Sequence, residues 1–211
     1  YIFAVYYYSN TPKKKIMIEI KNLCFGYKKS KNVLENVNLN LKKGCIHGLF
    51  GKNGVGKTTL LKLIGGLQFP DKGEVKVGEF TPSERKVAFL ADMFFISEEL
   101  YDSHLTIEKY VKINSVFYPN FSQQDFEAYL KDFEIEDTKQ YLHKLSYGTK
   151  KKIFISFGLA CHCKLILLDE PTNGLDIPSK SQFRKVILRA MSDETRSEER
   201  RVGKECHDEC R

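Results

Sequence analysis

The sequence predicts one α/β domain with a strand-rich N-terminal edge and an inserted helical lobe. Near the N-terminus, apolar and polar residues alternate as in half-buried strands. A glycine-rich stretch, "GKNGVGKTT", joins a short apolar run to a helical pattern. A second apolar run, "LILL", ends in Asp169 and Glu170, and the carboxyl ends of strands are where open α/β sheets bind ligands. The length of 211 residues suits one domain.

Strand and helix patterns follow one another along the chain. Period-two alternation and short apolar runs predict strands at 17–27, 33–41, 45–50, 73–79, 86–91 and 164–170. Helical spacing predicts helices at 57–67, 106–117, 122–133 and 179–191. Thr106 and Ser122 stand where N-caps are expected. Residues 92–160 carry mainly helical signals, so we expect them to form a helical subdomain inserted into the α/β core.

The two ends of the chain differ from the pattern between them. Residues 1–16 precede Met17 and are expected to be a non-native or disordered leader, and the domain itself is expected to span 17–195. The stretch "RSEERRVGKEC" resembles the translation of a sequencing-library adapter, so 196–211 is expected to be an artefactual or disordered tail. Cys206, His207 and Cys210 in this tail lack a full set of metal ligands.

Composition and charge narrow the classes of function. The net charge is +7, but the lysines are scattered and are expected to form solvated faces, with nucleic acid or anionic lipid as the alternative. No basic motif is interleaved with aromatic residues, so we predict no nucleic-acid partner. Six cysteines do not form a dense disulfide framework in a chain of this length, and free buried thiols are expected, including those of "CHC" at 161–163. No apolar run approaches the about 18 residues needed to span a bilayer, which predicts a cytosolic chain.

The glycine-rich stretch has the pattern G-x-x-x-x-G-K-T at Gly51, Gly56, Lys57 and Thr58. Between a strand and a helix, such glycines let backbone amides curl around phosphate oxygens, and the helix dipole adds positive charge there. Lys57 is expected to reach the β- and γ-phosphates, and the Thr58 hydroxyl to bind Mg²⁺. The alternative is a glycine-rich turn that binds nothing.

The acidic pair after the second apolar run supplies complementary chemistry. Asp169 is predicted to hold Mg²⁺, directly or through water, and Glu170 to orient and polarise an attacking water. The alternative is an acidic pair that merely caps a strand. This alternative is weaker when the same chain also has a phosphate-binding loop.

Together these residues resemble the nucleotide-binding subunit of an ATP-binding cassette (ABC) transporter, over residues 17–195. "LSYGTKKK" looks like the signature of that family, usually written LSGGQ, although Tyr147 and Thr149 depart from it. The resemblance implies that Ser146 and Gly148 contact the γ-phosphate of ATP bound to a second cassette, in trans. Without the resemblance, a simple helix N-cap at Ser146 would explain the same residues.

Other positions take their expected roles from the same resemblance. Tyr27 matches the aromatic residue that stacks on adenine, with packing on the core as the alternative. Asp176 lies in "NGLD", which resembles the D-loop at the dimer interface. The family Gln that links Mg²⁺ and water to the permease falls on or near Asp92, at the end of the predicted strand 86–91. A further strand ending in the family's switch histidine is not found after residues 179–191.

The resemblance thus implies a P-loop ATPase core with ATP and Mg²⁺ as ligands. The expected ATP-binding residues are Tyr27, Gly51, Asn53, Gly54, Gly56, Lys57, Thr58 and Thr59, with Glu170 and Lys57 catalytic and Thr58 and Asp169 on the metal. The expected partners are a transmembrane permease and a second cassette, on the cytoplasmic face of the membrane. The alternatives are a soluble ABC ATPase and an ATP-binding module without hydrolysis.

Overall fold

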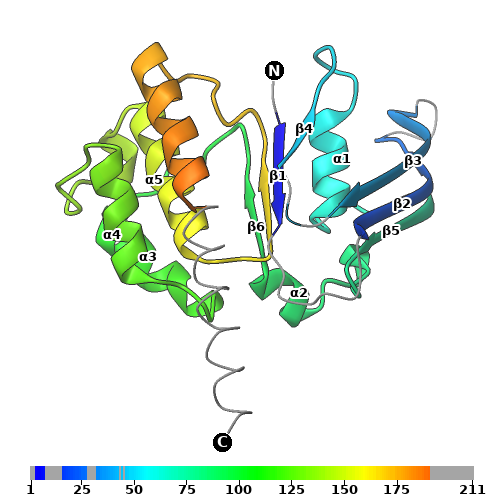
Figure 1. Ribbon diagram of the computed structural model, residues 1–211, viewed down its shortest axis with the longest axis horizontal. Coiled ribbons are helices and arrows are strands. Elements are labelled where there is room, and N and C mark those ends of the chain that lie inside the picture. The colour runs from blue at the N-terminus through cyan, green and yellow to red at the C-terminus, as the bar shows by residue number, and fades with distance from the viewer. Residues whose placement is uncertain (1–2, 8–15, 28–31, 43, 45, 191–211) are drawn as a thin grey trace, which may run out of the picture.

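The computed structural model describes residues 3–7, 16–27, 32–42, 44 and 46–190. Two sheets and a helical lobe lie side by side, with the four-stranded sheet in the middle of the view in Figure 1. Helix α1 lies between the four-stranded sheet and the three-stranded sheet. This arrangement confirms the predicted α/β core with a strand-rich N-terminal edge and a helical subdomain.

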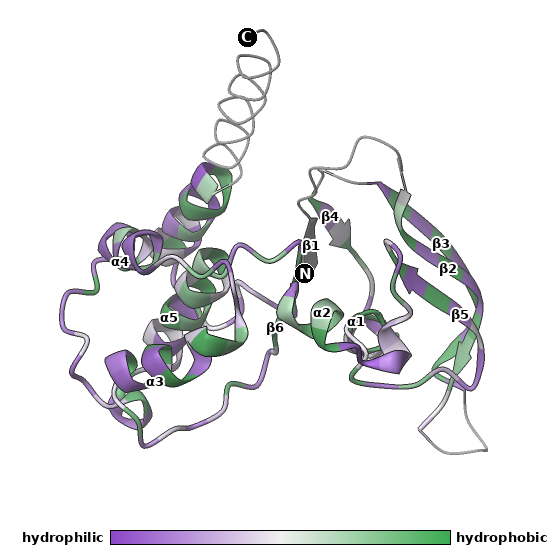
Figure 2. Ribbon diagram, turned by 90° about the horizontal axis from the view of Figure 1, so that it is seen from below, coloured by the Kyte–Doolittle hydropathy of each residue, from purple (hydrophilic) through white to green (hydrophobic). Residues whose placement is uncertain are grey.

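The three-stranded sheet is antiparallel in the order β3-β2-β5. Its strands are β2 (Ile16–Phe25), β3 (Leu34–Lys42) and β5 (Lys72–Val77). Ile18 lies opposite Val77, and Ile20 lies opposite Val75, and all four are buried. Of the residues between them, Lys76 is exposed and Glu19 is half-buried, and hydrophobic and hydrophilic residues alternate along these strands in Figure 2. One face therefore buries apolar side chains beneath α1, as the period-two pattern predicts.

The four-stranded sheet has the order β4-β1-β7-β6. Its strands are β1 (Phe3–Tyr7), β4 (His47–Leu49), β6 (Met93–Ile96) and β7 (Leu165–Leu168). β6 and β7 pair in parallel, whereas β1 runs antiparallel to both of its neighbours, β4 and β7. The expectation that residues 1–16 are disordered is therefore wrong for the five residues of β1. That this leader is non-native stays a prediction.

Helix α1 (Lys57–Ile64) packs against both sheets. Its residues Leu60, Leu61, Leu63 and Ile64 are buried in one apolar cluster that also contains side chains of β2, β5 and β7. Because this cluster anchors the helix on two sides, it fixes where the first turn of α1 lies relative to the end of β7. That first turn and that strand end carry the predicted site.

The helical lobe surrounds a second apolar core. It contains α3 (Ile107–Asn114), α4 (Gln123–Asp132), α5 (Tyr147–Ala160), helical residues 177–190, and the short 3₁₀ helices Ser115–Phe117 and Leu142–Lys144. Phe157 is fully buried at its centre. The side-chain oxygens of Thr106 and Ser122 accept hydrogen bonds from the amides of Lys109 and Asp125, which confirms both predicted N-caps.

The segment between the sheets and the lobe corrects one prediction. Residues 86–91, "KVAFLA", are expected to be a strand, but α2 (Val87–Ala91) is helical, and the strand is β6, two residues further on. A 3₁₀ helix (Pro82–Glu84) precedes α2. Only Phe89 of α2 is buried, whereas β6 lies against β7. A short apolar run does not distinguish helix from strand, and pairing with β7 decides it. The helical subdomain accordingly begins after Ile96 rather than at 92.

The expectation of buried free thiols is confirmed for Cys161 and Cys163, whereas Cys24 is free but only half-buried. Cys24, Cys161 and Cys163 are free thiols, and the last two are buried in the core of the lobe. His162 between them contacts Asp125, with 2.8 Å between Nε2 and Oδ2. Cys45 and the tail 196–211, with Cys206, His207 and Cys210, lie outside the described residues. Among the described residues, no helix is long and apolar enough to cross a membrane.

Candidate functional site

The phosphate-binding loop connects β4 to α1. Gly54 and Gly56 have φ angles of 78° and 98°, in the left-handed region that favours glycine. A Cβ at Gly56 would also lie 2.9 Å from Leu34 Cδ2, so the loop packs too closely on β3 for a larger residue. The first turn of α1 contains no acidic residue. The loop therefore presents backbone amides and a helix N-terminus without a carboxylate that would repel an anion.

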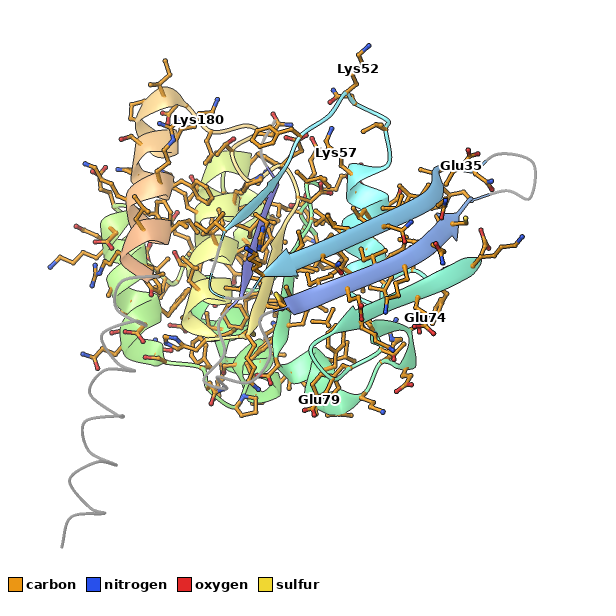
Figure 3. The ribbon with its side chains drawn as sticks, turned by 45° about the vertical axis from the view of Figure 1, so that its right-hand side comes forward. Glu35, Lys52, Lys57, Glu74, Glu79 and Lys180 are labelled. Carbon is orange, nitrogen blue, oxygen red and sulfur yellow. The ribbon has the colours of Figure 1, made fainter. Side chains whose placement is uncertain are left out.

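Lys57 directs its ammonium group to the centre of this loop. Its side chain is 7% exposed, and Nζ donates hydrogen bonds to the carbonyls of Gly51 (2.8 Å) and Lys52 (2.9 Å). Figure 3 shows Lys52 pointing outward from the tip of the loop, whereas Lys57 lies inside it. The lysine that the motif singles out is therefore the one whose ammonium group lies inside the loop.

Thr58 and Asp169 meet although 111 residues separate them in the sequence. Thr58 Oγ1 donates a hydrogen bond to Asp169 Oδ1 over 3.0 Å. Asp169 is 2% exposed, and its burial raises the pKa of the carboxyl group, an effect that the Thr58 hydroxyl opposes. A hydroxyl and a carboxylate are hard oxygen ligands suited to Mg²⁺.

Glu170 follows Asp169 in a left-handed conformation, with φ 46°. For a residue other than glycine this conformation costs about 1–2 kcal/mol, so neighbouring contacts must hold it. Burial raises the pKa of the Glu170 carboxyl, the charge of Glu98 raises it further, and Lys57 opposes both. The side chain is therefore a stronger proton acceptor than an ordinary surface glutamate.

These elements line one cavity of about 500 Å³. The residues around it are Tyr27, Val33, Asn53, Gly54, Gly56, Lys57, Thr58, Thr59, Glu98, Glu170 and Asn173. The structure thus brings together most of the predicted ATP-binding residues. Gly51 contributes its carbonyl to Lys57 from the edge of the loop, and Asp169 reaches the cavity through Thr58.

Tyr27 lies at the open side of this cavity. Its hydroxyl is 3.1 Å from Thr59 Oγ1, and its ring meets the ring of Phe25 edge to face at 5.0 Å. The residue is 58% exposed. An aromatic ring anchored at one edge and open at the other can stack on a base.

Glu98, which the sequence analysis missed, lines the cavity, whereas Asp92 does not. Asp92 follows α2, and its carboxylate pairs with Lys164 away from the cavity. Glu98 follows β6, lines the cavity, and accepts a hydrogen bond from Asn173 Nδ2 over 2.7 Å. The error follows from the predicted strand at 86–91. The Gln was expected just after that strand, but the strand is β6, which ends at Ile96. The run "MFFI" followed by "SEE" is the signal that could have located it.

The signature residues lie apart from the cavity of their own chain. Ser146 caps α5, and its Oγ accepts a hydrogen bond from the Thr149 amide over 3.1 Å. Gly148 lies in the first turn of the same helix, and neither residue lines the cavity. Asp176 accepts a hydrogen bond from the Ser179 amide, and hydrogen bonds from the side chain and then the amide of Ser179 lower the pKa of its carboxyl group. None of these three residues therefore contacts a ligand in the cavity from within one chain.

The loop, its lysine, and the Thr58–Asp169 pair at the carboxyl end of β7 define a P-loop nucleotide-binding domain. The sequence profile of the family described as "ABC transporter" matches residues 34–173. The chain belongs to the ABC transporter family.

Individual relatives agree with this assignment. The chain is 33% identical over 183 residues to the ABC transporter ATP-binding protein YtrB of Bacillus subtilis, covering 84% of this chain and 59% of YtrB. It is 31% identical to the SkfA peptide export ATP-binding protein SkfE of the same organism, covering 78% of this chain and 70% of SkfE. A bacterial ABC transporter cassette solved as a dimer superposes with a TM-score of 0.71 at 26% identity, covering 84% of each chain.

Proposed function

We propose that this chain binds ATP with Mg²⁺ and hydrolyses it, and that hydrolysis powers a separate transmembrane permease. The observation that carries the proposal is the contact between Thr58 and Asp169 beside the lysine-centred loop. This contact brings the P-loop and the acidic pair together, although 111 residues separate Thr58 from Asp169 in the sequence. Membership of the ABC transporter family supports the same reaction.

The residues present fit the triphosphate and its metal ion. The loop amides and Lys57 Nζ would neutralise negative charge on the β- and γ-phosphates. Thr58 and Asp169 would hold Mg²⁺, which prefers one or two protein oxygens together with phosphate oxygens. When bound, Mg²⁺ would offset part of the negative charge on the phosphates.

Glu170 is the proposed general base. Its carboxylate lines the cavity with Lys57 and Thr58, and its raised pKa suits proton acceptance. It would accept a proton from a water molecule as the water oxygen bonds to the γ-phosphorus and the bond to the β-phosphate oxygen breaks. Tyr27 would stack on the adenine, since its ring is open at the mouth of the cavity.

Two cassettes are proposed to complete each site. Ser146 and Gly148 do not line the cavity of their own chain, so a second cassette would present its signature to the γ-phosphate, with Asp176 near the interface. The dimeric cassette found among the related structures supports this assembly. The permease partner would place the protein on the cytoplasmic face of a membrane.

A phosphate-release assay on the purified chain tests the reaction. With Mg²⁺ and ATP we expect continuous release of phosphate, and with excess EDTA we expect release to stop because Thr58 and Asp169 then lack their ion. Binding of a fluorescent ATP analogue, measured in parallel, separates the two main outcomes. Binding without phosphate release would replace this proposal with the alternative of a non-hydrolysing ATP-binding module.

A further inference from the structure

Lys151 is a fully buried lysine in the second turn of α5, and its hydrogen-bond acceptors are two backbone carbonyls and a hydroxyl. Nζ donates hydrogen bonds to the backbone carbonyls of Glu170 (2.5 Å) and Asn173 (3.3 Å). A third bond runs to the Tyr147 hydroxyl over 3.2 Å. These acceptors match the three protons of an ammonium group. A buried cation is costly, so the two bonds to the loop after β7, together with the bond to Tyr147 of the same helix, indicate a dedicated contact.

Tyr147 extends the contact to a second loop. Its hydroxyl donates a hydrogen bond to the backbone carbonyl of Glu98. Its ring packs on Gly174, where an added Cβ would lie 2.5 Å from Tyr147 Cδ1. Asn173 joins the same two loops, because its side chain donates to the Glu98 carboxylate. Tyr147, one of the two residues that depart from the family signature, therefore has a defined structural role in this chain.

The acceptor of the shortest of the three Lys151 bonds is a residue in a strained conformation. The Glu170 carbonyl accepts from Lys151 and also from the Asn173 amide, over 3.1 Å. Glu170 has a left-handed backbone, and such a conformation persists only where its surroundings hold it. Lys151 is fixed in the same helix whose first residue is capped by Ser146. Lys151 thus links helix α5, the signature helix, to the backbone of Glu170 within one chain.

We propose that Lys151 is a positioning residue that holds Glu170 in place for hydrolysis, and that Tyr147 couples this contact to the loop of Glu98. The role in hydrolysis rests on the proposed function. The contact makes the backbone of the proposed base depend on the placement of the signature helix. When Ser146 contacts the γ-phosphate of ATP held by a second cassette, the contact would therefore affect the position of Glu170 in the chain that contributes Ser146.

The test replaces Lys151 with Met, which keeps the length of the side chain and removes its donors. Lys150→Met is the matched control, because the neighbouring lysine pairs with Asp102 instead. Tyr147→Phe is a milder variant that keeps the ring and removes only the hydroxyl. Hydrogen exchange of the Asn173 amide is measured without nucleotide, followed by kcat for ATP and Kd for a non-hydrolysable analogue.

We expect Lys151→Met to speed exchange of the Asn173 amide by about tenfold or more and to lower kcat by a similar factor, with Kd unchanged. Tyr147→Phe should act in the same direction, and Lys150→Met should change neither. Unchanged exchange in both Lys151→Met and Tyr147→Phe would overturn the proposal, as would equal losses of kcat and affinity. If Lys151→Met does not fold, Tyr147→Phe decides. If the parent chain releases no phosphate, the proposed function fails, and the exchange data alone decide whether Lys151 holds Glu170.

Discussion

Replacing Glu170 with Gln is expected to lower kcat for ATP by about 100-fold or more, the contribution typical of a general base. The amide has nearly the same shape as the carboxylate but does not accept the proton of the attacking water. The fold should be preserved, because Lys151 and the Asn173 amide bond to the backbone carbonyl of Glu170 and not to its side chain. ATP binding should persist, and the ATP-bound dimer should accumulate. Phosphate release and size-exclusion chromatography measure the two effects.

Glu79→Gln is the matched control for this substitution. Glu79 is an exposed glutamate that lies away from the P-loop in Figure 3, and its replacement should leave turnover unchanged. If Glu170→Gln hydrolyses ATP at the parent rate, Glu170 is not the base. The raised pKa of its carboxyl group would then reflect only burial and the neighbouring carboxylates of Glu98 and Asp169.

Replacing Lys57 with Met is expected to abolish detectable turnover and to weaken ATP binding. Removal of one positioned donor in an active site costs about 100- to 1,000-fold in kcat, and Lys57 also supplies the positive charge at the centre of the loop. The left-handed glycines Gly54 and Gly56 should keep the turn of the loop, while the two hydrogen bonds from Lys57 Nζ to the carbonyls of Gly51 and Lys52 are lost. ATP titration and phosphate release give both quantities.

Lys180→Met controls for the loss of one positive charge. Lys180 lies in the helical residues 177–190 of the lobe, well separated from Lys57 in Figure 3. Its replacement should change neither affinity nor turnover. Undiminished ATP binding by Lys57→Met would show that the triphosphate does not bind at this loop, and equal losses in both variants would point to a nonspecific effect of charge.

The parts of the site that the sequence predicted well are those encoded locally. The P-loop is contiguous, and its glycines, lysine and threonine act through the turn that they themselves form. The contact of Thr58 with Asp169 could also be anticipated, because each comes after a short apolar run predicted as a buried strand, and strand ends in α/β sheets carry ligand-binding residues. The helix caps at Thr106 and Ser122 depend only on residues three positions away.

The parts that the sequence did not predict depend on tertiary contacts. "KVAFLA" has the composition of a buried strand, yet β6 follows it, and this shift concealed Glu98. Nothing near Lys151 in the sequence distinguishes it from Lys150 and Lys152, and only the approach of the Glu170 loop buries it. Phe3–Tyr7 forms a strand because it pairs with β4 on one side and with β7 on the other.

The most direct test of whether two cassettes share each ATP site is to measure turnover per chain as a function of chain concentration, at saturating ATP and Mg²⁺. If two cassettes complete each site, turnover per chain should rise with concentration and then level off as dimers form. Sedimentation velocity on Glu170→Gln with ATP identifies the concentrations at which monomers predominate. Constant turnover per chain throughout that monomeric range would contradict the account, because one chain would then hydrolyse ATP without a signature from its partner.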